Sequence, residues 1–141
     1  MRQLVTGLDV EIAEWVRLQC PGVHDWGQCT AIGLADENKL IAGVVFNRFH
    51  RGLSIDISVD ETPGKQWLSR SFLHDVFVYP FRQLNLNKVQ SFIPASNRRS
   101  ERLCVGLGFT LEGRLREAWP GGEDLLVYGM LARECRWIKG H

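Results

Sequence analysis

The pattern of apolar and polar positions predicts a helix near the start of the chain. Between Asp9 and Leu18 apolar residues recur about every 3.6 residues, and Asp9 stands in the N-cap position. Pro21 and Gly22 follow, and neither residue continues a helix well. We therefore expect a first helix over residues 9–18.

Three short runs rich in Ile, Val and Phe come next, separated by polar or glycine-containing segments. They cover residues 29–35, 40–49 and 53–60. In the third run Ile55, Ile57 and Val59 alternate with Ser and Asp, so one face is apolar and the other carries hydroxyls and carboxylates. The runs predict three antiparallel strands within residues 28–60.

The second half of the chain predicts a long helix, then strands with one short helix between them. Apolar residues at helical spacing predict that residues 65–84 are mainly helical, with a kink or break at Pro80, which lacks a backbone donor. The later predicted elements are a strand at 88–94, a helix at 97–105 closed by Gly106 and Gly108, a hairpin of strands at 109–119 and 125–131, and a trailing tail at 133–137.

This order of elements predicts an α+β fold, with one mixed, mainly antiparallel sheet and helices on both faces. The chain has 141 residues, which is enough for one hydrophobic core, so we expect a single domain over residues 1–141. No internal repeat or linker interrupts the pattern.

Charge and hydropathy exclude several classes of function. Seventeen Lys and Arg residues against sixteen Asp and Glu residues give a net charge of +1, so nucleic-acid binding would need a local basic patch and is not expected. Apolar runs are far shorter than the roughly 18 residues that a membrane span requires. The N-terminal residues lack the apolar centre of a signal peptide, so we expect a cytoplasmic protein.

The four cysteines do not form a recognised metal motif. They stand at positions 20, 29, 104 and 135, with no C-x-x-C spacing, and we expect free thiols. Cys20, His24 and Cys29 offer three ligand types near one loop, but their spacing matches no zinc pattern and a fourth ligand is missing. No metal is expected.

One ordered string of residues in the last third of the chain carries a family resemblance. It runs Asn97-x-x-Ser100-x-x-Leu103, then Leu107-Gly108-Phe109-Thr110-Leu111-Glu112-Gly113, and after a Gly-Gly turn Asp124 and Val127-Tyr128-Gly129-Met130. The string resembles the GNAT acyltransferases of the RimL/RimJ type, including their short phage-borne members. The resemblance is sharp over residues 97–134, looser over 40–96 and absent from the N-terminus.

The resemblance implies acetyl-CoA as the donor and a primary amine as the acceptor, with direct attack of the amine on the thioester. The pantetheine arm would pair with the strand around Ile57 and Val59. The pyrophosphate would lie on backbone N–H groups where the following helix starts, at Gly64, Lys65 and Gln66. The family loop begins with Arg or Gln, whereas this chain has Glu61, and a plain turn before a helix is the alternative interpretation.

Basic residues cluster on the helix after Asn97. Arg98, Arg99 and Arg102 could bind the phosphates of coenzyme A or of nucleic acid, and the resemblance favours coenzyme A. Arg70 is a further cation near the start of the preceding helix.

An ammonium acceptor must lose a proton before it attacks, so a carboxylate is expected near the site. Asp56 on the third predicted strand and Glu117 on the strand after Gly113 are the candidates for this base. In RimL-like enzymes the proposed acid of that later strand would fall at position 119, which is Trp here. Solvent exposure without a catalytic role is the alternative for Glu117.

Three residues on one helix have roles implied by the family. Ser100 matches the serine proposed to assist the departing thiolate, and its alternative is a plain surface serine. Asn97 matches the family asparagine of the donor site and is also suited to cap the helix. The tyrosine that many GNAT enzymes use in this helix is replaced by Cys104, which we expect to pack.

The residues therefore favour an N-acetyltransferase that acts on a protein N-terminus or a small amine. A catalytically inactive GNAT-fold module that binds a partner protein is the alternative, supported by the altered loop and by Trp119. Five tryptophans could also line a protein interface or a homodimer contact.

Overall fold

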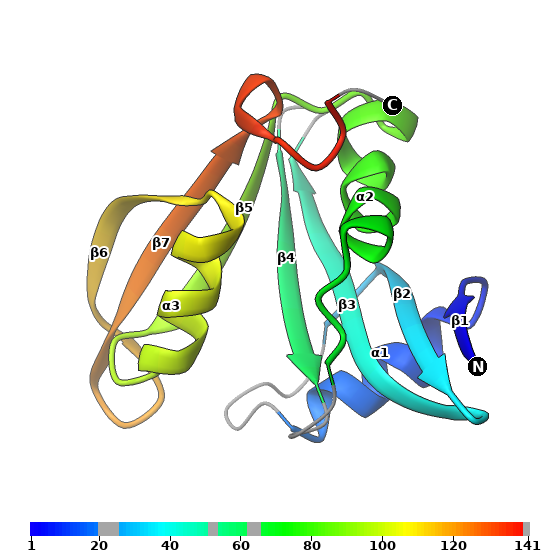
Figure 1. Ribbon diagram of the computed structural model, residues 1–141. Helices are drawn as coiled ribbons and strands as arrows, with labels where there is room; N and C mark the ends of the chain where they lie inside the picture. Colours follow the sequence, from blue (N-terminus) through cyan, green and yellow to red (C-terminus); the bar gives the residue numbers. More distant parts are fainter. Residues whose placement is uncertain (20–25, 51–53, 62–65, 140–141) are drawn as a thin grey trace.

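The computed structural model describes residues 1–19, 26–50, 54–61 and 66–139, which include one seven-stranded sheet in the order β1-β2-β3-β4-β5-β7-β6 (Figure 1). The strands are β1 (Arg2–Val5), β2 (Cys29–Asp36), β3 (Lys39–His50), β4 (Ser54–Glu61), β5 (Lys88–Pro94), β6 (Thr110–Trp119) and β7 (Glu123–Leu131). The helices are α1 (Asp9–Arg17), α2 (Arg70–Val78) and α3 (Arg98–Leu107), with a π-helical turn at Tyr79–Gln83 and a 3-10 turn at Ala132–Glu134.

The three predicted antiparallel strands are confirmed, because β2 pairs with β3 and β3 with β4 in antiparallel register. β6 and β7 form the predicted hairpin, and β7 also pairs antiparallel with β5. The turn predicted at residues 51–52 lies outside the described residues. The predicted α+β class, with a mainly antiparallel sheet and helices on both faces, is confirmed.

The sequence pattern did not predict strand β1, which pairs with β2 at the edge of the sheet. β1 has four residues, and three of them are exposed. Such a short, exposed strand shows no alternation of apolar and polar positions, so its formation depends on the neighbouring β2.

The prediction that Asp9 caps the first helix is wrong. Helix α1 starts at Asp9, and Leu8 precedes it without a side-chain cap. The Asp9 carboxylate instead accepts a hydrogen bond from the Ala31 N–H at 2.9 Å. The pairing of β2 with β1 ends at Gly33. Because Ala31 lies outside this paired part of β2, its backbone N–H bonds to a residue of another element.

The central helix is shorter than predicted at its start. It begins at Arg70, because the Ser69 hydroxyl caps it by accepting the Phe72 N–H at 3.1 Å. The break predicted near Pro80 is confirmed: the α-helix passes into a π-helical turn, in which the Leu84 N–H bonds to the Tyr79 carbonyl oxygen five residues earlier.

The helices lie on opposite faces of the sheet. On one, the α1 face, Ile12 and Val16 pack on β2 and β3 with the buried Ala31 and Val45. The other, the α2–α3 face, is covered by α2 and α3 (Figure 1).

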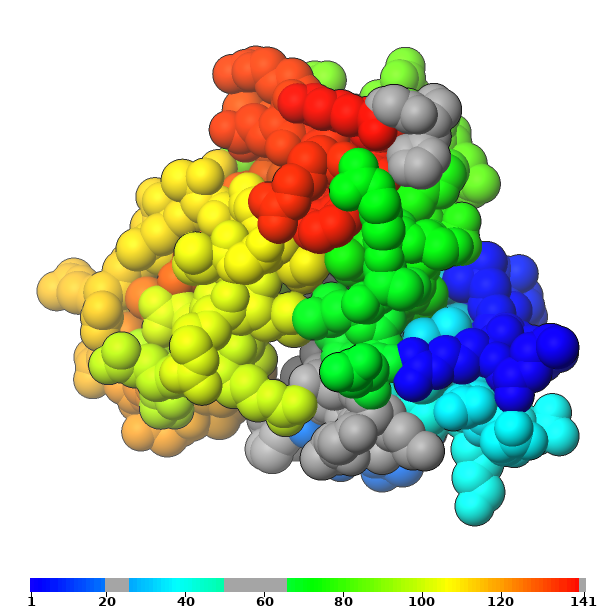
Figure 2. Space-filling model, viewed as in Figure 1, coloured from blue at the N-terminus to red at the C-terminus, as the bar shows by residue number. Residues whose placement is uncertain are grey.

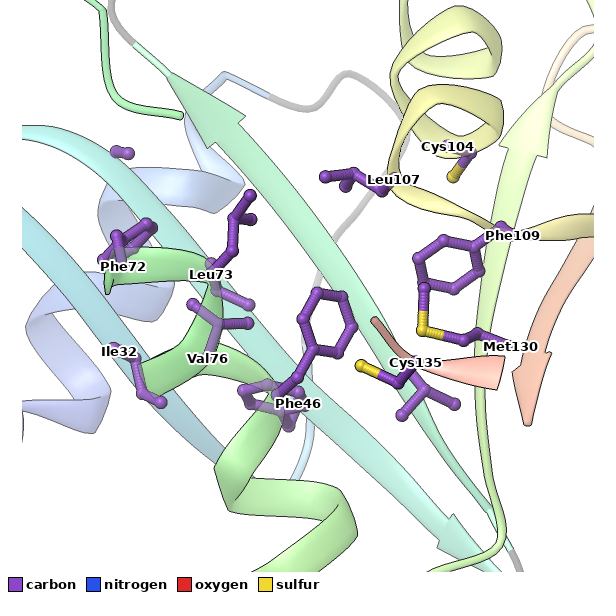
Figure 3. Packing of buried hydrophobic residues seen from close by; sticks show 14 of the residues in the cluster. Ile32, Phe46, Phe72, Leu73, Val76, Cys104, Leu107, Phe109, Met130 and Cys135 are labelled. Atoms are coloured by element: carbon purple, nitrogen blue, oxygen red, sulfur yellow. The ribbon is translucent and has the colours of Figure 1, made fainter. Parts of the chain in front are cut away.

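The C-terminal segment is packed rather than trailing, so the expectation of a tail at residues 133–137 is wrong. Cys135 is fully buried and joins the cluster between α2, α3 and the sheet (Figure 3). The Arg82 side chain donates to the Ile138 carbonyl oxygen at 2.5 Å. Four of the eight residues at 132–139 are charged, so the segment gives no periodic signal, yet its few apolar side chains fill the end of the core.

Candidate functional site: a groove in front of diverging strands

The parallel strands β4 and β5 separate part-way along their length. Their pairs are Ser54 with Lys88, Ile55 with Val89 and Asp56 with Gln90. Beyond Asp56, β4 continues to Glu61 along β3, and beyond Gln90, β5 continues to Pro94 along β7. Figure 1 shows the two strands diverging toward the lower end of the sheet. This opening leaves the β5-facing edge of β4 without a paired strand in the described residues.

Ile57 and Val59, the predicted pantetheine-binding residues, lie on this part of β4. Their backbones pair with Phe46 and Val44 of β3 on the other side. Backbone groups along the open edge need hydrogen-bond partners, and an extended ligand with amide groups can supply them.

A groove of about 320 Å³ lies between α2 and α3 on the α2–α3 face. Its lining comprises Leu68, Ser69, Arg70, Leu73, Arg102, Leu103, Gly106, Leu107 and Trp137. Figure 3 shows Leu107 of α3 directed toward α2 in front of β4, with Leu73 on the opposite side. In Figure 2 the residues around the start of α2 (green) face those of α3 (yellow) across this groove. The groove thus has an apolar floor that lies over the diverging strands.

The rim of the groove is basic. Arg70 stands in the first turn of α2, next to the Ser69 cap, and Arg102 projects from α3; both side chains are exposed. A helix N-terminus and two guanidinium groups together favour a ligand that bears phosphate groups.

The C-terminal segment forms one wall of the groove. The indole Nε1 of Trp137 donates to the Leu107 carbonyl oxygen at 2.9 Å, at the last turn of α3. The guanidinium carbon of Arg136 lies 4.5 Å from the centroid of the Trp137 ring, and Arg136 also donates to the Gly106 carbonyl oxygen. The sequence pattern did not predict this wall, and the large aromatic side chain at Trp137 was its one indication.

A polar cluster lies between α3 and the sheet at the level where β4 and β5 separate. The buried Tyr128 hydroxyl donates to a Glu101 carboxylate oxygen at 2.7 Å, and burial together with that carboxylate raises the pKa of Tyr128 to about 12. Burial raises the pKa of the Cys104 thiol to about 11, although a hydrogen bond with Ser91 opposes the shift. Cys104 therefore packs as a neutral thiol, as the sequence predicted.

The Cys104 thiol should react slowly with alkylating agents. Alkylation requires the thiolate, and a rise of the pKa from 9.0 to about 11 lowers the thiolate fraction near pH 8 about 100-fold, before burial restricts access. Peptide mass spectrometry after iodoacetamide treatment, in native buffer and in urea, measures the ratio of the two rates. Equal rates would show that Cys104 is accessible in the folded protein.

Asn97 and Ser100 lie together at the start of α3. The Asn97 side-chain oxygen accepts the Ser100 N–H at 3.1 Å and caps the helix. Asn97 therefore has the helix-capping role that its sequence position suggested. Ser100 is half-buried in the first turn. Both precede the groove-lining residues of α3 in the same helix.

The two candidate bases lie in different parts of the sheet. The Asp56 backbone forms the last pair with β5, at the root of the opening. Glu117 is exposed on β6, the outermost strand, where its φ of 53° places it in a bulge and its N–H donates to Asp124 at 2.9 Å. The strand β7 separates β6 from β5, so the structure does not bring Glu117 and Asp56 together.

Of the predicted pyrophosphate loop, Gly64 and Lys65 lie outside the described residues. Gln66 is exposed and lies four residues before the helix, which starts at Arg70 rather than at residue 65. The basic groups that the structure places beside the start of the helix are therefore Arg70 and, across the groove, Arg102.

A second hollow, of about 330 Å³, lies on the other side of α2. Asp9, Thr30, Asp75 and Tyr79 contribute to its lining, and the Tyr79 hydroxyl donates to the Thr30 hydroxyl at 2.9 Å. It is as large as the groove, but it lies at the β1–β2 side of the sheet, away from the diverging strands. We therefore take the groove between α2 and α3 as the candidate functional site.

No family model and no curated protein matches this sequence. Solved structures do match its fold. The spermidine N-acetyltransferase SpeG N152L mutant from Vibrio cholerae matches with a TM-score of 0.76 and 17% identity, over 98% of this chain and 96% of that chain. An acetyltransferase of the GNAT family from Bacillus anthracis matches with a TM-score of 0.63 and 20% identity, over 74% and 67% of the two chains.

The chain has the GNAT fold. This confirms the fold expected from the resemblance over residues 97–134. In the described residues, no helix is long and apolar enough to span a membrane.

Proposed function

We propose that the protein is an acetyl-CoA-dependent N-acetyltransferase that moves an acetyl group to a primary amine. The observation that carries this proposal is the coincidence of two features, the end of β4–β5 pairing at Asp56 and Gln90 and the basic-rimmed groove above it. An apolar groove with arginine side chains at its rim suits a long ligand that has a thioester at one end and phosphates at the other. The acetyltransferases of the same fold support this assignment.

The donor would lie with its pantetheine arm along Ile57 and Val59 and its phosphates near Arg70 and Arg102. The proposed donor site also includes Gly64, Lys65, Gln66 and Asn97, because the family resemblance implies them. Acetyl-CoA supplies an activated thioester. The apolar floor, which includes Leu73 and Leu107, excludes water from the thioester and so limits hydrolysis.

The transfer forms a C–N bond and breaks the C–S bond of the thioester. Asp56, directly or through a water molecule, would take the proton that the ammonium must lose, and Glu117 is the second candidate for this role. Ser100 would serve the departing thiolate. Because burial raises the pKa of Cys104 to about 11, this thiol stays neutral at physiological pH and does not compete as a nucleophile.

The acceptor is a primary amine on a small molecule or at a protein N-terminus. The string from Asn97 to Met130 favours a RimL/RimJ-like enzyme that acts on protein N-termini, whereas structures of the same fold include enzymes named for spermidine. Acetylation of a panel of peptide N-termini and small amines, followed by mass spectrometry, separates these substrates.

Acetyl-CoA should raise the melting temperature of the protein. A ligand at about 100 times its dissociation constant adds about 2.7 kcal/mol to the free energy of unfolding. Arg102→Glu should weaken donor binding about 10-fold or more, since a hydrogen bond to a charged group contributes about 1.5–3 kcal/mol. Differential scanning fluorimetry and calorimetry measure both effects.

Arg116→Glu is the matched control, because Arg116 is exposed on β6 and does not line the groove. A normal affinity for acetyl-CoA in Arg102→Glu would contradict the donor site. If acetyl-CoA neither binds nor raises the melting temperature of the wild-type protein, the inactive binding module replaces the proposed enzyme.

A further inference from the structure

We propose that Trp137 contacts the nucleobase of the donor, so that the protein selects acetyl groups carried on coenzyme A over acetyl groups carried on phosphopantetheine alone. This inference deepens the proposed function and rests on it. Trp137 lies in the C-terminal segment after β7 and lines the groove between α2 and α3. Of the described residues that line the groove, Trp137 is the one aromatic residue, and none carries a carboxylate.

The last turn of α3 holds the Trp137 ring in place. The indole Nε1 donates to the Leu107 carbonyl oxygen at 2.9 Å, and the Arg136 guanidinium carbon lies 4.5 Å from the ring centroid. Arg136 in turn donates to the Gly106 carbonyl oxygen. Carbonyl groups in the last turn of a helix have no partner within the helix, so they are available to these two side chains. The ring is therefore fixed against the groove by α3 itself.

The same C-terminal segment is also tied to the helix on the other side of the groove. Cys135 and Ile138 are buried in the cluster between α2, α3 and the sheet. Arg82, in the π-helical turn after α2, donates to the Ile138 carbonyl oxygen at 2.5 Å. In Figure 2 the segment (red) lies between α3 (yellow) and α2 (green). A ligand meets a ring whose position is set before binding, which lowers the entropy cost of the contact.

The basic rim places Trp137 beside the nucleotide half of the donor. Arg70 and Arg102 line the same groove as Trp137. In coenzyme A the phosphates join the pantetheine arm to the nucleoside, so phosphates bound at this rim leave the arm on the β4 side and the nucleoside on the other. Trp137 is half-buried, with part of its surface against the core and part in the groove. The nucleobase is the part of the donor that this geometry brings to the ring.

The chemistry of the ring distinguishes the parts of the donor. A flat aromatic base gains from offset-stacked or edge contacts with an indole, whereas phosphates are repelled by the negative face of the ring. The aliphatic amide arm has no aromatic group. Glu134, the carboxylate of the C-terminal segment, accepts the Leu131 N–H at 2.9 Å, and the charged group against the ring is the Arg136 cation. The surroundings of Trp137 thus favour an electron-rich base.

The test compares acetyl-CoA with S-acetyl phosphopantetheine, which has the same thioester arm but no nucleoside. Trp137→Leu should weaken the binding of acetyl-CoA about 5- to 150-fold, the usual range for a base–aromatic contact, and change the binding of S-acetyl phosphopantetheine much less. Trp137→Phe keeps an aromatic ring and should retain most of the affinity for acetyl-CoA. Calorimetric titration of both ligands into the same preparation measures the effect, because any loss of folded protein then affects both titrations alike.

Adenosine bisphosphate, the nucleotide half of coenzyme A, provides a second measurement. It should displace acetyl-CoA from the wild-type protein and from Trp137→Phe, and it should displace far less at the same concentration from Trp137→Leu. Trp15→Leu is the matched control, because Trp15 belongs to α1 and packs on the other face of the sheet. This control should bind all three ligands as the wild type does.

Equal losses for acetyl-CoA and S-acetyl phosphopantetheine in Trp137→Leu would show that Trp137 only shapes the groove. Unchanged binding of both ligands, or no displacement of acetyl-CoA from the wild type by adenosine bisphosphate, would remove the nucleobase from this wall. Each of these results overturns the inference while the binding of acetyl-CoA stands. A wild-type protein that does not bind acetyl-CoA would instead contradict the proposed function and this inference with it.

Discussion

Asp56→Asn should lower kcat/KM for acetyl transfer about 100- to 10,000-fold, because general base catalysis contributes a factor of this size. Asp56 pairs with Gln90 at the last position where β4 and β5 are joined. The Asp56 backbone therefore lies at the root of the opening along which the proposed donor would bind. Initial-rate assays with a fixed amine and varied pH measure the effect, and the loss should be largest where the wild-type base is ionised.

Two further variants sharpen this test. Glu117→Gln tests the other candidate base. If this variant loses activity while Asp56→Asn keeps a normal rate, Glu117 on β6 is the base. Asp75→Asn is the control for a lost carboxylate, since Asp75 lies on α2 beside the second hollow and not in the groove. Full activity in both Asp56→Asn and Glu117→Gln would show that solvent takes the proton.

The central strands and helices could be predicted because each has a clear apolar pattern. β3 is buried on both faces over residues 41–47, and α2 buries Phe72, Leu73 and Val76 at helical spacing. The elements that were missed or misjudged lack this pattern. β1 is too short to show a period, and the segment around Cys135 contributes isolated apolar side chains to a core that already exists.

The candidate site was predictable to the extent that single residues carry its chemistry. Asn97 shows its capping role in sequence, and Arg70 and Arg102 are recognisable as cations for phosphate. The groove wall at Trp137 could not be predicted, because its position depends on a hydrogen bond to Leu107 in another element. No local pattern encodes such a contact.

The end of β3 shows the same limit more clearly. In a regular strand Arg48 would face away from Phe92 of β5, yet its guanidinium carbon lies 5.5 Å from the centroid of the Phe92 ring. The bulge between Asn47 and His50 changes this direction, and the sequence around it has neither Gly nor Pro to signal a bulge. A residue of this kind is found from the geometry of the sheet.

The packing of α1 on the sheet depends on a pair of glycines that face each other across two strands. Gly33 of β2 and Gly43 of β3 are direct partners, and together they leave a shallow trough in which α1 lies. A Cβ atom at Gly43 would stand 2.6 Å from Val16 Cγ2 and 3.3 Å from both Ile12 Cγ2 and Trp15 Cε3. Three side chains of α1 therefore occupy the space that any side chain at Gly43 would need.

Gly43→Val should lower the free energy of unfolding by about 1–3 kcal/mol or more, because overpacking of a filled core forces side chains and backbone to move. For a chain of this size that corresponds to a fall of about 2–10 °C in melting temperature. Gly113→Val is the matched control, because a Cβ at Gly113 meets no atom within 4 Å. Adding Val16→Ala to Gly43→Val removes the nearest methyl group, so the cost of the glycine replacement should be smaller in that background. A Gly43→Val protein as stable as the wild type would show that α1 does not rest in this trough.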